Sequence, residues 1–274
     1  MLSNITIGRY YAVESRVHAL DPRLKILSTF AYLILLFVID SVWSLFFCAF
    51  LLFPAIKASK IPFKFVLKGV RPILFIVFLT ALLNLFMTDG HLIARFYFLK
   101  ITHEGILRSV FMASRLVFLI MSSSLMTFTT TELALTDGIE SLLKPFKIVK
   151  VPAHEIAMMM SIALRFIPTL IDETDKIMKA QMARGASFDS KNIVKKAKSF
   201  LPLLIPIFIS SFKRAEDLAL AMEARCYRGG EGRTRLNKLK YGRHDLIAAA
   251  IVISAMLLAL LLDRLLFANY WGVI

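Results

Sequence analysis

Long uncharged stretches alternate along this chain with short segments rich in lysine and arginine. Five of the stretches are apolar enough to cross a bilayer: 26–39, 41–56, 72–88, 116–131 and 246–262. Several fall short of the roughly 20 residues that a spanning helix needs, so neighbouring cationic side chains must reach to the interface. Asp40 and Ser41 form a tight turn, so the first two stretches are expected to form a membrane hairpin. The pattern predicts an all-α integral membrane protein with about five transmembrane helices.

Composition and charge support the class of membrane proteins and exclude that of nucleic-acid binders. The 274 residues are 58% hydrophobic and carry a net charge of +15, whereas a soluble domain is nearer half apolar. A basic surplus suits either a nucleic-acid binder or a membrane protein with positive loops on the inner side. Since a nucleic-acid binder has no use for long uncharged stretches, we expect a lipid bilayer and no nucleic acid as a partner.

The distribution of lysine and arginine predicts the orientation. Segments 40–43 and 265–274 carry none, 57–71 carries five, 89–110 carries three, and 132–245 holds 20 of the 34. The N-terminus is therefore expected inside, with the basic segments inside, the poor segments outside, and the C-terminus outside. The corresponding domains are a transmembrane bundle of four spans at 1–131, a cytoplasmic coupling-helix domain at 132–245, and a final transmembrane helix at 246–274.

Two further apolar stretches, 156–171 and 200–212, would raise the number of spans from five to seven if they crossed the membrane. If both crossed the membrane, the connection 172–199 with its seven basic residues would lie outside, against the charge bias. Prolines also interrupt both stretches. We therefore interpret them as interfacial or protein-packed cytoplasmic helices, with helices expected from Glu132 to about Leu143, from Pro152 to about Ala183, and from about Val194 to Ala224.

The last two of these helices end alike. Aligned without gaps, their final turns place Ile177 with Leu218 and Ala180 with Ala221, and then reach two triads, Ala183-Arg184-Gly185 and Ala224-Arg225-Cys226. One interpretation is chance, because arginine suits a helix C-terminus. The other is a pair of equivalent tips, in which small neighbours let each arginine enter a groove and form forked pairs with carboxylates on two similar partners.

These triads resemble the paired Ala-Arg-Gly motifs of the transmembrane T component of energy-coupling factor transporters, the vitamin importers of the ABC class (the EcfT and CbiQ-like family). The segments Ala163–Pro168, Ala221–Arg225 and Asp21-Pro22-Arg23 are also similar to that family. The resemblance covers essentially the whole chain and is closest to the shared-module, or group II, type. Cys226 departs from the usual glycine or serine, and a left-handed turn there would be less comfortable.

The resemblance implies a non-catalytic coupling subunit in the plasma membrane of a prokaryote. The six residues of the two triads would dock two ABC ATPase subunits, whose ATP-driven motion would be transmitted to an interchangeable vitamin-binding S component. Met158, Met159 and Met160 begin an apolar helix, and flexible methionines suit a surface that accepts several partners. Ordinary core packing is the alternative explanation for them.

Other chemistry is not expected. His154-Glu155 lacks the second histidine of a zinc motif, since position 158 is methionine, and no phosphate loop occurs, so we expect no metal and no cofactor. Arg115 could be a buried functional charge, but we favour a side chain that reaches to the interface. The main rival function is a conventional ABC importer permease with its own substrate path.

Overall fold

The computed structural model describes residues 10–96, 99–149, 152–186, 193–229 and 239–270. The chain divides into two compact units, one made of Gly8–Gly138 with Leu239–Ile274 and the other of Ile139–Lys238. We refer to them as the bundle unit and the coupling unit, and each is described by itself.

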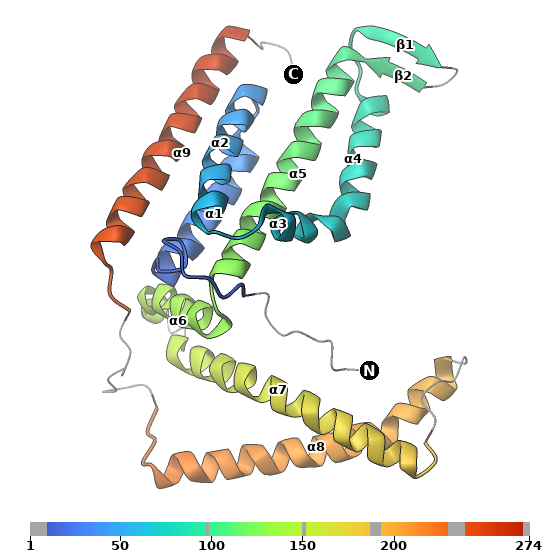
Figure 1. The fold of residues 1–274 in the computed structure, drawn as a ribbon, viewed down its shortest axis with the longest axis vertical. Coiled ribbons are helices and arrows are strands. Elements are labelled where there is room, and N and C mark those ends of the chain that lie inside the picture. Colours follow the sequence, from blue (N-terminus) through green and yellow to red (C-terminus); the bar gives the residue numbers. More distant parts are fainter. Residues whose placement is uncertain (1–9, 97–98, 150–151, 187–192, 230–238, 271–274) are drawn as a thin grey trace. The chain divides into compact units, whose positions relative to one another are not determined.

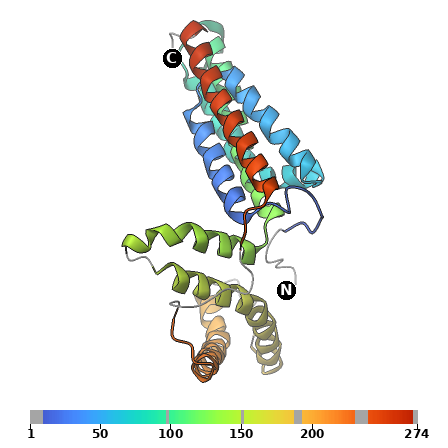
Figure 2. The same cartoon turned by 90° about the vertical axis from the view of Figure 1, so that its left-hand side faces the viewer.

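The bundle unit is a set of long helices with one small hairpin (Figure 1). Its elements are α1 (Pro22–Val38), α2 (Val42–Ala58), α3 (Phe63–Val70), the 3-10 turn η1 (Arg71–Ile73), α4 (Leu74–Met87), β1 (Leu92–Phe96), β2 (Leu99–Thr102), α5 (His103–Thr129) and α9 (Arg243–Tyr270). The central helix α5 contacts α1, α2, α3 and α4, while α9 lies along α1 and α2 (Figure 2). The core therefore lies around α5 and includes Leu36, Cys48 and Met121.

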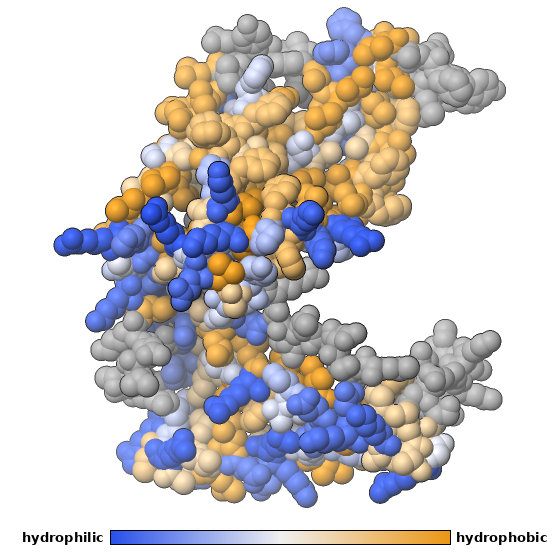
Figure 3. Space-filling view, viewed as in Figure 1, coloured by the Kyte–Doolittle hydropathy of each residue, from blue (hydrophilic) through white to orange (hydrophobic). Residues whose placement is uncertain are grey.

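The outer surface of these helices is apolar, as a bilayer requires. Phe37, Phe46 and Phe75 are each about two-thirds or more exposed, at 66%, 66% and 72%. Figure 3 shows a hydrophobic surface over the bundle helices, which gives way to hydrophilic residues at the level of α3. By length and composition, Phe63–Met87, α5, α7 and Arg243–Leu265 could each cross a membrane, and α2 is a shorter apolar helix. The predicted class of helical membrane protein is confirmed.

A two-stranded antiparallel hairpin is an addition that the sequence pattern did not predict. Strands β1 and β2 pair Phe96 with Leu99 and Leu92 with Thr102, and they join α4 to α5. The hairpin lies at the end of α4 and α5 that is opposite to α3 (Figure 1). The segments 57–71 and 89–110, both counted as basic, thus lie at opposite ends of α4, so the orientation argument rests on the two richest segments, 57–71 and 132–245.

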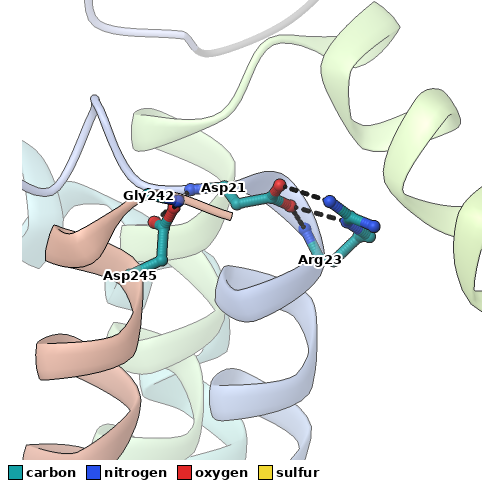
Figure 4. A network of polar contacts seen from close by, with 4 residues as sticks. All are labelled: Asp21, Arg23, Gly242 and Asp245. Atoms are coloured by element: carbon teal, nitrogen blue, oxygen red, sulfur yellow. Dashed lines mark hydrogen bonds and ion pairs between the residues drawn. The ribbon is translucent and has the colours of Figure 1, made fainter. Parts of the chain in front are cut away.

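The first and last helices are joined by a buried carboxylate at one end of the bundle (Figure 4). Asp245 accepts the backbone N–H of Asp21 through one oxygen and that of Gly242 through the other, both at 2.8 Å. Asp21 in turn caps α1 by accepting the backbone N–H of Arg23 at 2.8 Å, and its second oxygen pairs with the Arg23 guanidinium at 2.8 Å. The start of α9 is thereby hydrogen-bonded to the start of α1.

The opposite end of α9 makes a similar contact at the turn between α1 and α2. Asp263 accepts the backbone N–H of Ser41 at 2.9 Å. Arg115 of α5 is 9% exposed, donates to the carbonyl oxygen of Ile39, and lies 3.6 Å from the Asp40 carboxylate. The prediction that Arg115 reaches to the interface is wrong, because its side chain is buried in the bundle, where it donates to a carbonyl oxygen of the turn and lies near the exposed Asp40.

The coupling unit contains two long helices that were predicted closely. Helix α6 spans Glu132–Leu143 and starts in the bundle unit, followed by a 3-10 turn η2 (Lys144–Val149), α7 (Ala153–Ala183) and α8 (Ile193–Ala224). Helix α7 has 31 residues and continues through Pro168, and α8 has 32 residues and continues through Pro202 and Pro206. The two helices contact each other and cross, as Figure 1 shows.

Candidate functional site

The first triad forms the C-terminal cap of α7. Arg184 is the cap residue, and Gly185 follows it with a left-handed φ of 90°. The N–H of Gly185 donates to the carbonyl oxygen of Met182 at 3.0 Å, and the N–H of Ala186 donates to that of Gln181 at 3.0 Å. This pair of bonds defines a Schellman cap. Glycine suits the position after Arg184 because it has no Cβ to resist a positive φ.

The second triad repeats the same cap at the end of α8. The N–H of Cys226 donates to the carbonyl oxygen of Glu223 at 2.8 Å, and the N–H of Tyr227 donates to that of Met222 at 3.0 Å. Cys226 adopts a φ of 55°, so it takes the left-handed conformation that Gly185 takes in the first cap. For a residue with a side chain this conformation costs roughly 1–2 kcal/mol. The echo in the sequence thus corresponds to one backbone geometry formed twice.

Both arginines are presented outward. Arg184 and Arg225 are exposed, as are the alanine before and the residue after each of them. Within the described part of the chain, neither guanidinium forms an ion pair or a side-chain hydrogen bond. In Figure 1 the C-terminal ends of α7 and α8 lie at opposite ends of the crossed pair. A guanidinium presents five N–H donors in a planar fork, so each tip can bind a carboxylate-lined groove.

A polar cluster joins α7 to α8 where they cross. Glu173 accepts a hydrogen bond from the Ser210 hydroxyl through one oxygen and from the Arg214 guanidinium at 2.6 Å through the other. An open apolar groove beside this cluster is lined by side chains of both helices, among them Phe166, Leu170, Leu218 and Met222. Nothing in the sequence pointed to this pairing, because Glu173 and Arg214 are 41 residues apart in the chain and carry no shared motif.

The three successive methionines do not form one face of α7. Met159 is 58% exposed, whereas Met158 and Met160 are half-buried. Successive residues of a helix point about 100° apart, so the three side chains spread over more than half of its circumference. Ala153 and Ala157 are the buried residues at this end of α7. Of these three methionines, Met159 is therefore the most available to a partner.

Metal-binding side chains do not gather beside these features in the part of the chain that the structure describes. There, no three His, Cys, Asp or Glu side chains lie close enough together to hold a metal ion. His154 instead lies 3.4 Å from the Glu140 carboxylate. The coupling unit presents two outward arginines, a polar contact where α7 and α8 cross, and an apolar groove.

Comparison with known proteins gives matches over almost the entire chain. Residues 14–236 match the family of the cobalt transport protein CbiQ. The chain is 52% identical over 267 residues to the energy-coupling factor transporter transmembrane protein EcfT of Ruminiclostridium cellulolyticum, covering 97% of this chain and all of that protein. It is 56% identical to the EcfT of Thermosediminibacter oceani (90% and 93% covered) and 44% identical to that of Bacillus subtilis (96% and 98% covered).

Proposed function

The chain belongs to the family of transmembrane T components of energy-coupling factor transporters, non-catalytic subunits of bacterial membrane transporters, and we propose that its two arginine tips dock two ABC ATPase subunits. In this proposal Arg184 enters a groove on one ATPase and Arg225 enters the equivalent groove on the other. The flanking residues Ala183, Gly185, Ala224 and Cys226 allow the close approach.

The strongest support is the repeated cap geometry. Two Schellman caps with arginine at the same position present the same functional group in the same backbone frame. One shape formed twice suits two partners of similar structure. The exposure of both guanidinium groups, with no intramolecular ion pair among the described residues, leaves their donors available for a partner's carboxylates.

The crossing of α7 and α8 supplies a route for coupling. ATP binding would draw the two ATPases together and move the tips, and the contact of Glu173 with Ser210 and Arg214 would act as the pivot between the helices. The apolar part of α7, including Met158, Met159 and Met160, would receive the vitamin-binding S component. We infer further that the transporter is of the shared-module type, in which several S components use one T component.

Charge reversal at the tips tests the docking. Truncating a buried interface arginine commonly costs about 2 kcal/mol or more, so Arg184→Glu combined with Arg225→Glu should release the ATPases from the complex purified in detergent. Lys179→Glu combined with Lys213→Glu makes the same change in charge on the same two helices, at exposed positions outside the triads. A double tip variant that still co-purifies with both ATPases would refute the assignment.

Replacing the three methionines tests the second contact. Met158, Met159 and Met160 changed together to aspartate should abolish capture of the S component while the ATPases stay bound. Loss of both partners, or of neither, would contradict an S-component site on α7. Capture of two different S components by the unaltered protein would support the shared-module type.

We infer that the N-terminus and residues 132–245 lie in the cytoplasm and that the C-terminus lies outside. The 20 basic residues of 132–245 support this placement. Cys226 belongs to a docking triad, so the labelling positions are placed in a Cys226→Ser background, where the remaining Cys48 is buried. There Lys176→Cys, at an exposed position of α7, should react with a membrane-impermeant maleimide only after the cells are permeabilised. In a Cys226→Ser background, Asp89→Cys should be labelled in intact cells. The reverse pattern would overturn this orientation.

A further inference from the structure

A corner between α2 and α3 concentrates positive charge in a part of the chain without acids. No aspartate or glutamate occurs between Asp40 and Asp89. The corner, which we call the basic elbow, carries five exposed cationic residues: Lys57, Lys60, Lys64, Lys68 and Arg71. Within the described residues none of the five forms an ion pair. This surplus is therefore not neutralised by the bundle unit itself.

The elbow is a fixed structure and not a loose loop. Ser59 is fully buried, donates its hydroxyl to the carbonyl oxygen of Ile56 at 2.6 Å, and accepts the N–H of Ile61 at 3.3 Å. Lys60 turns the corner with a left-handed φ of 57°, a conformation that a lysine holds only where its surroundings impose it. The basic side chains therefore start from a defined backbone.

Helix α3 is anchored by one face and presents the opposite one. Val66 and Val70 are 0% and 3% exposed and face the bundle, where α3 contacts α5. Lys64 and Lys68 are one turn apart on the other side of the helix. In Figure 1, α3 runs across α5 instead of along it.

An apolar flank runs beside these lysines. Phe63 and Leu67 are exposed at 44% and 49%, and Phe63 stacks on Phe53 of α2 with ring centroids 5.9 Å apart. A short helix with an apolar flank and a cationic flank at the end of spanning helices has the character of an interfacial helix. Its apolar side chains can contact acyl chains while its ammonium groups reach the phosphates.

We propose that the basic elbow is a binding site for the headgroups of anionic phospholipids. Five cations, none of which pairs with an acid among the described residues, complement a negatively charged phosphodiester, and the adjacent phenylalanine and leucine fit the upper acyl chain of the same lipid. The site binds the lipid where the chain turns from α2 into α3. It is independent of the two arginine tips, which belong to the coupling unit.

The test measures binding of phosphatidylglycerol to the full chain in mixed detergent micelles at fixed salt, with phosphatidylcholine as the zwitterionic comparison. Each basic residue near a membrane surface contributes about fivefold in affinity, so Lys60→Gln, Lys64→Gln and Lys68→Gln together should weaken phosphatidylglycerol binding on the order of 100-fold. Binding of phosphatidylcholine should not change. Replacement of the same three lysines by arginine should preserve the binding.

Three controls separate a lipid site from an effect of net charge, from binding of free phosphate and from unfolding. Lys176→Gln, Lys179→Gln and Lys213→Gln remove the same charge from exposed positions of α7 and α8, and an equal loss of phosphatidylglycerol binding in that variant would show an effect of net charge and overturn the site. Unchanged phosphatidylglycerol binding in the elbow variant would also overturn it, as would release by millimolar inorganic phosphate. Protection of Cys48 from a thiol reagent must persist in every variant, so that unfolding is excluded as the cause.

An acidic surface of a partner protein is the competing occupant. If it covered the elbow, the glutamine variant would keep its phosphatidylglycerol binding and lose a subunit when the transporter is purified. That result would replace the lipid by a protein partner. Loss of lipid binding with an intact complex supports the proposal, even if the docking of the ATPases by Arg184 and Arg225 were to fail its own test.

Discussion

Removing the Asp245 carboxylate should loosen α9 from α1. Asp245 is 7% exposed and accepts the N–H groups of Asp21 and Gly242, each at 2.8 Å. A hydrogen bond to a charged group contributes about 1.5–3 kcal/mol, so Asp245→Ala should cost about 3–6 kcal/mol, because two N–H groups lose their acceptor. Asp245→Asn keeps one acceptor oxygen and should cost roughly half of that.

The buried thiol of Cys48 offers an assay for this loss. Cys48 is 0% exposed in the core between α1 and α2, so a maleimide dye reacts with it only when the bundle opens. In a Cys226→Ser background it is the remaining cysteine of the two in the chain. At about 2–4 °C per kcal/mol, the unfolding midpoint in detergent should fall by about 6 °C or more for Asp245→Ala.

A matched control separates this contact from a general effect of charge. Asp89 is an exposed aspartate of the same unit without an ion pair among the described residues, and Asp89→Ala should leave the midpoint within about 1 °C of the starting value. If the Asp245 and Asp89 variants unfold at the same temperature, the hydrogen bonds of Asp245 do not stabilise the bundle and the reasoning is refuted.

Three more predictions follow from the described contacts. Cys226→Gly should stabilise the end of α8 by about 1 kcal/mol, because glycine adopts the left-handed φ without strain; slower hydrogen exchange of the cap amides would show it, and unchanged exchange would contradict it. Glu173→Gln and Arg214→Met should be non-additive by roughly 0.2–1 kcal/mol in a double-mutant cycle of thermal unfolding, since the two side chains are 21% and 38% exposed; full additivity would show that this contact does not stabilise the crossing of α7 and α8. Burial alone would raise the pKa of Asp21, but the hydrogen bonds and charge of Arg23 outweigh burial and hold that pKa below its usual value. The resulting stability is complete above about pH 4 and is lost as pH falls through the lowered pKa, so acid unfolding should be less steep in Asp21→Asn, and an identical acid profile would contradict this.

The helices of the coupling unit could be predicted because their signals are local. The expected helix from Glu132 to Leu143 has the observed bounds, and the expected ends at Ala183 and Ala224 are the observed ends of α7 and α8. A hydroxyl cap, an acid in the first turn and a small residue after the last turn act within a few residues of the helix end. Such local signals do not depend on contacts with distant parts of the chain.

The ends of the bundle were predicted less well, because they depend on contacts between distant segments. The fourth apolar stretch was placed at 116–131, whereas α5 begins at His103 with Thr102 as its cap. Charged residues, among them Glu104 and Arg108, lower the hydropathy of the first half of this helix. Arg115 is tolerated inside the helix because the turn after α1 supplies its partners, and that turn is brought to α5 only by folding.

By itself, the sequence determined the membrane class, the long helices and the two triads, since hydropathy, caps and motifs are properties of neighbouring residues. Only the tertiary structure decided that Asp245 binds the start of α1, 224 positions away, and that Glu173 meets Arg214. It also decided that Cys226 takes the left-handed conformation of Gly185. These outcomes depend on packing, because the donors that a carboxylate binds are those that folding brings within hydrogen-bond distance of it. Likewise, a strained φ persists only where surrounding bonds hold it.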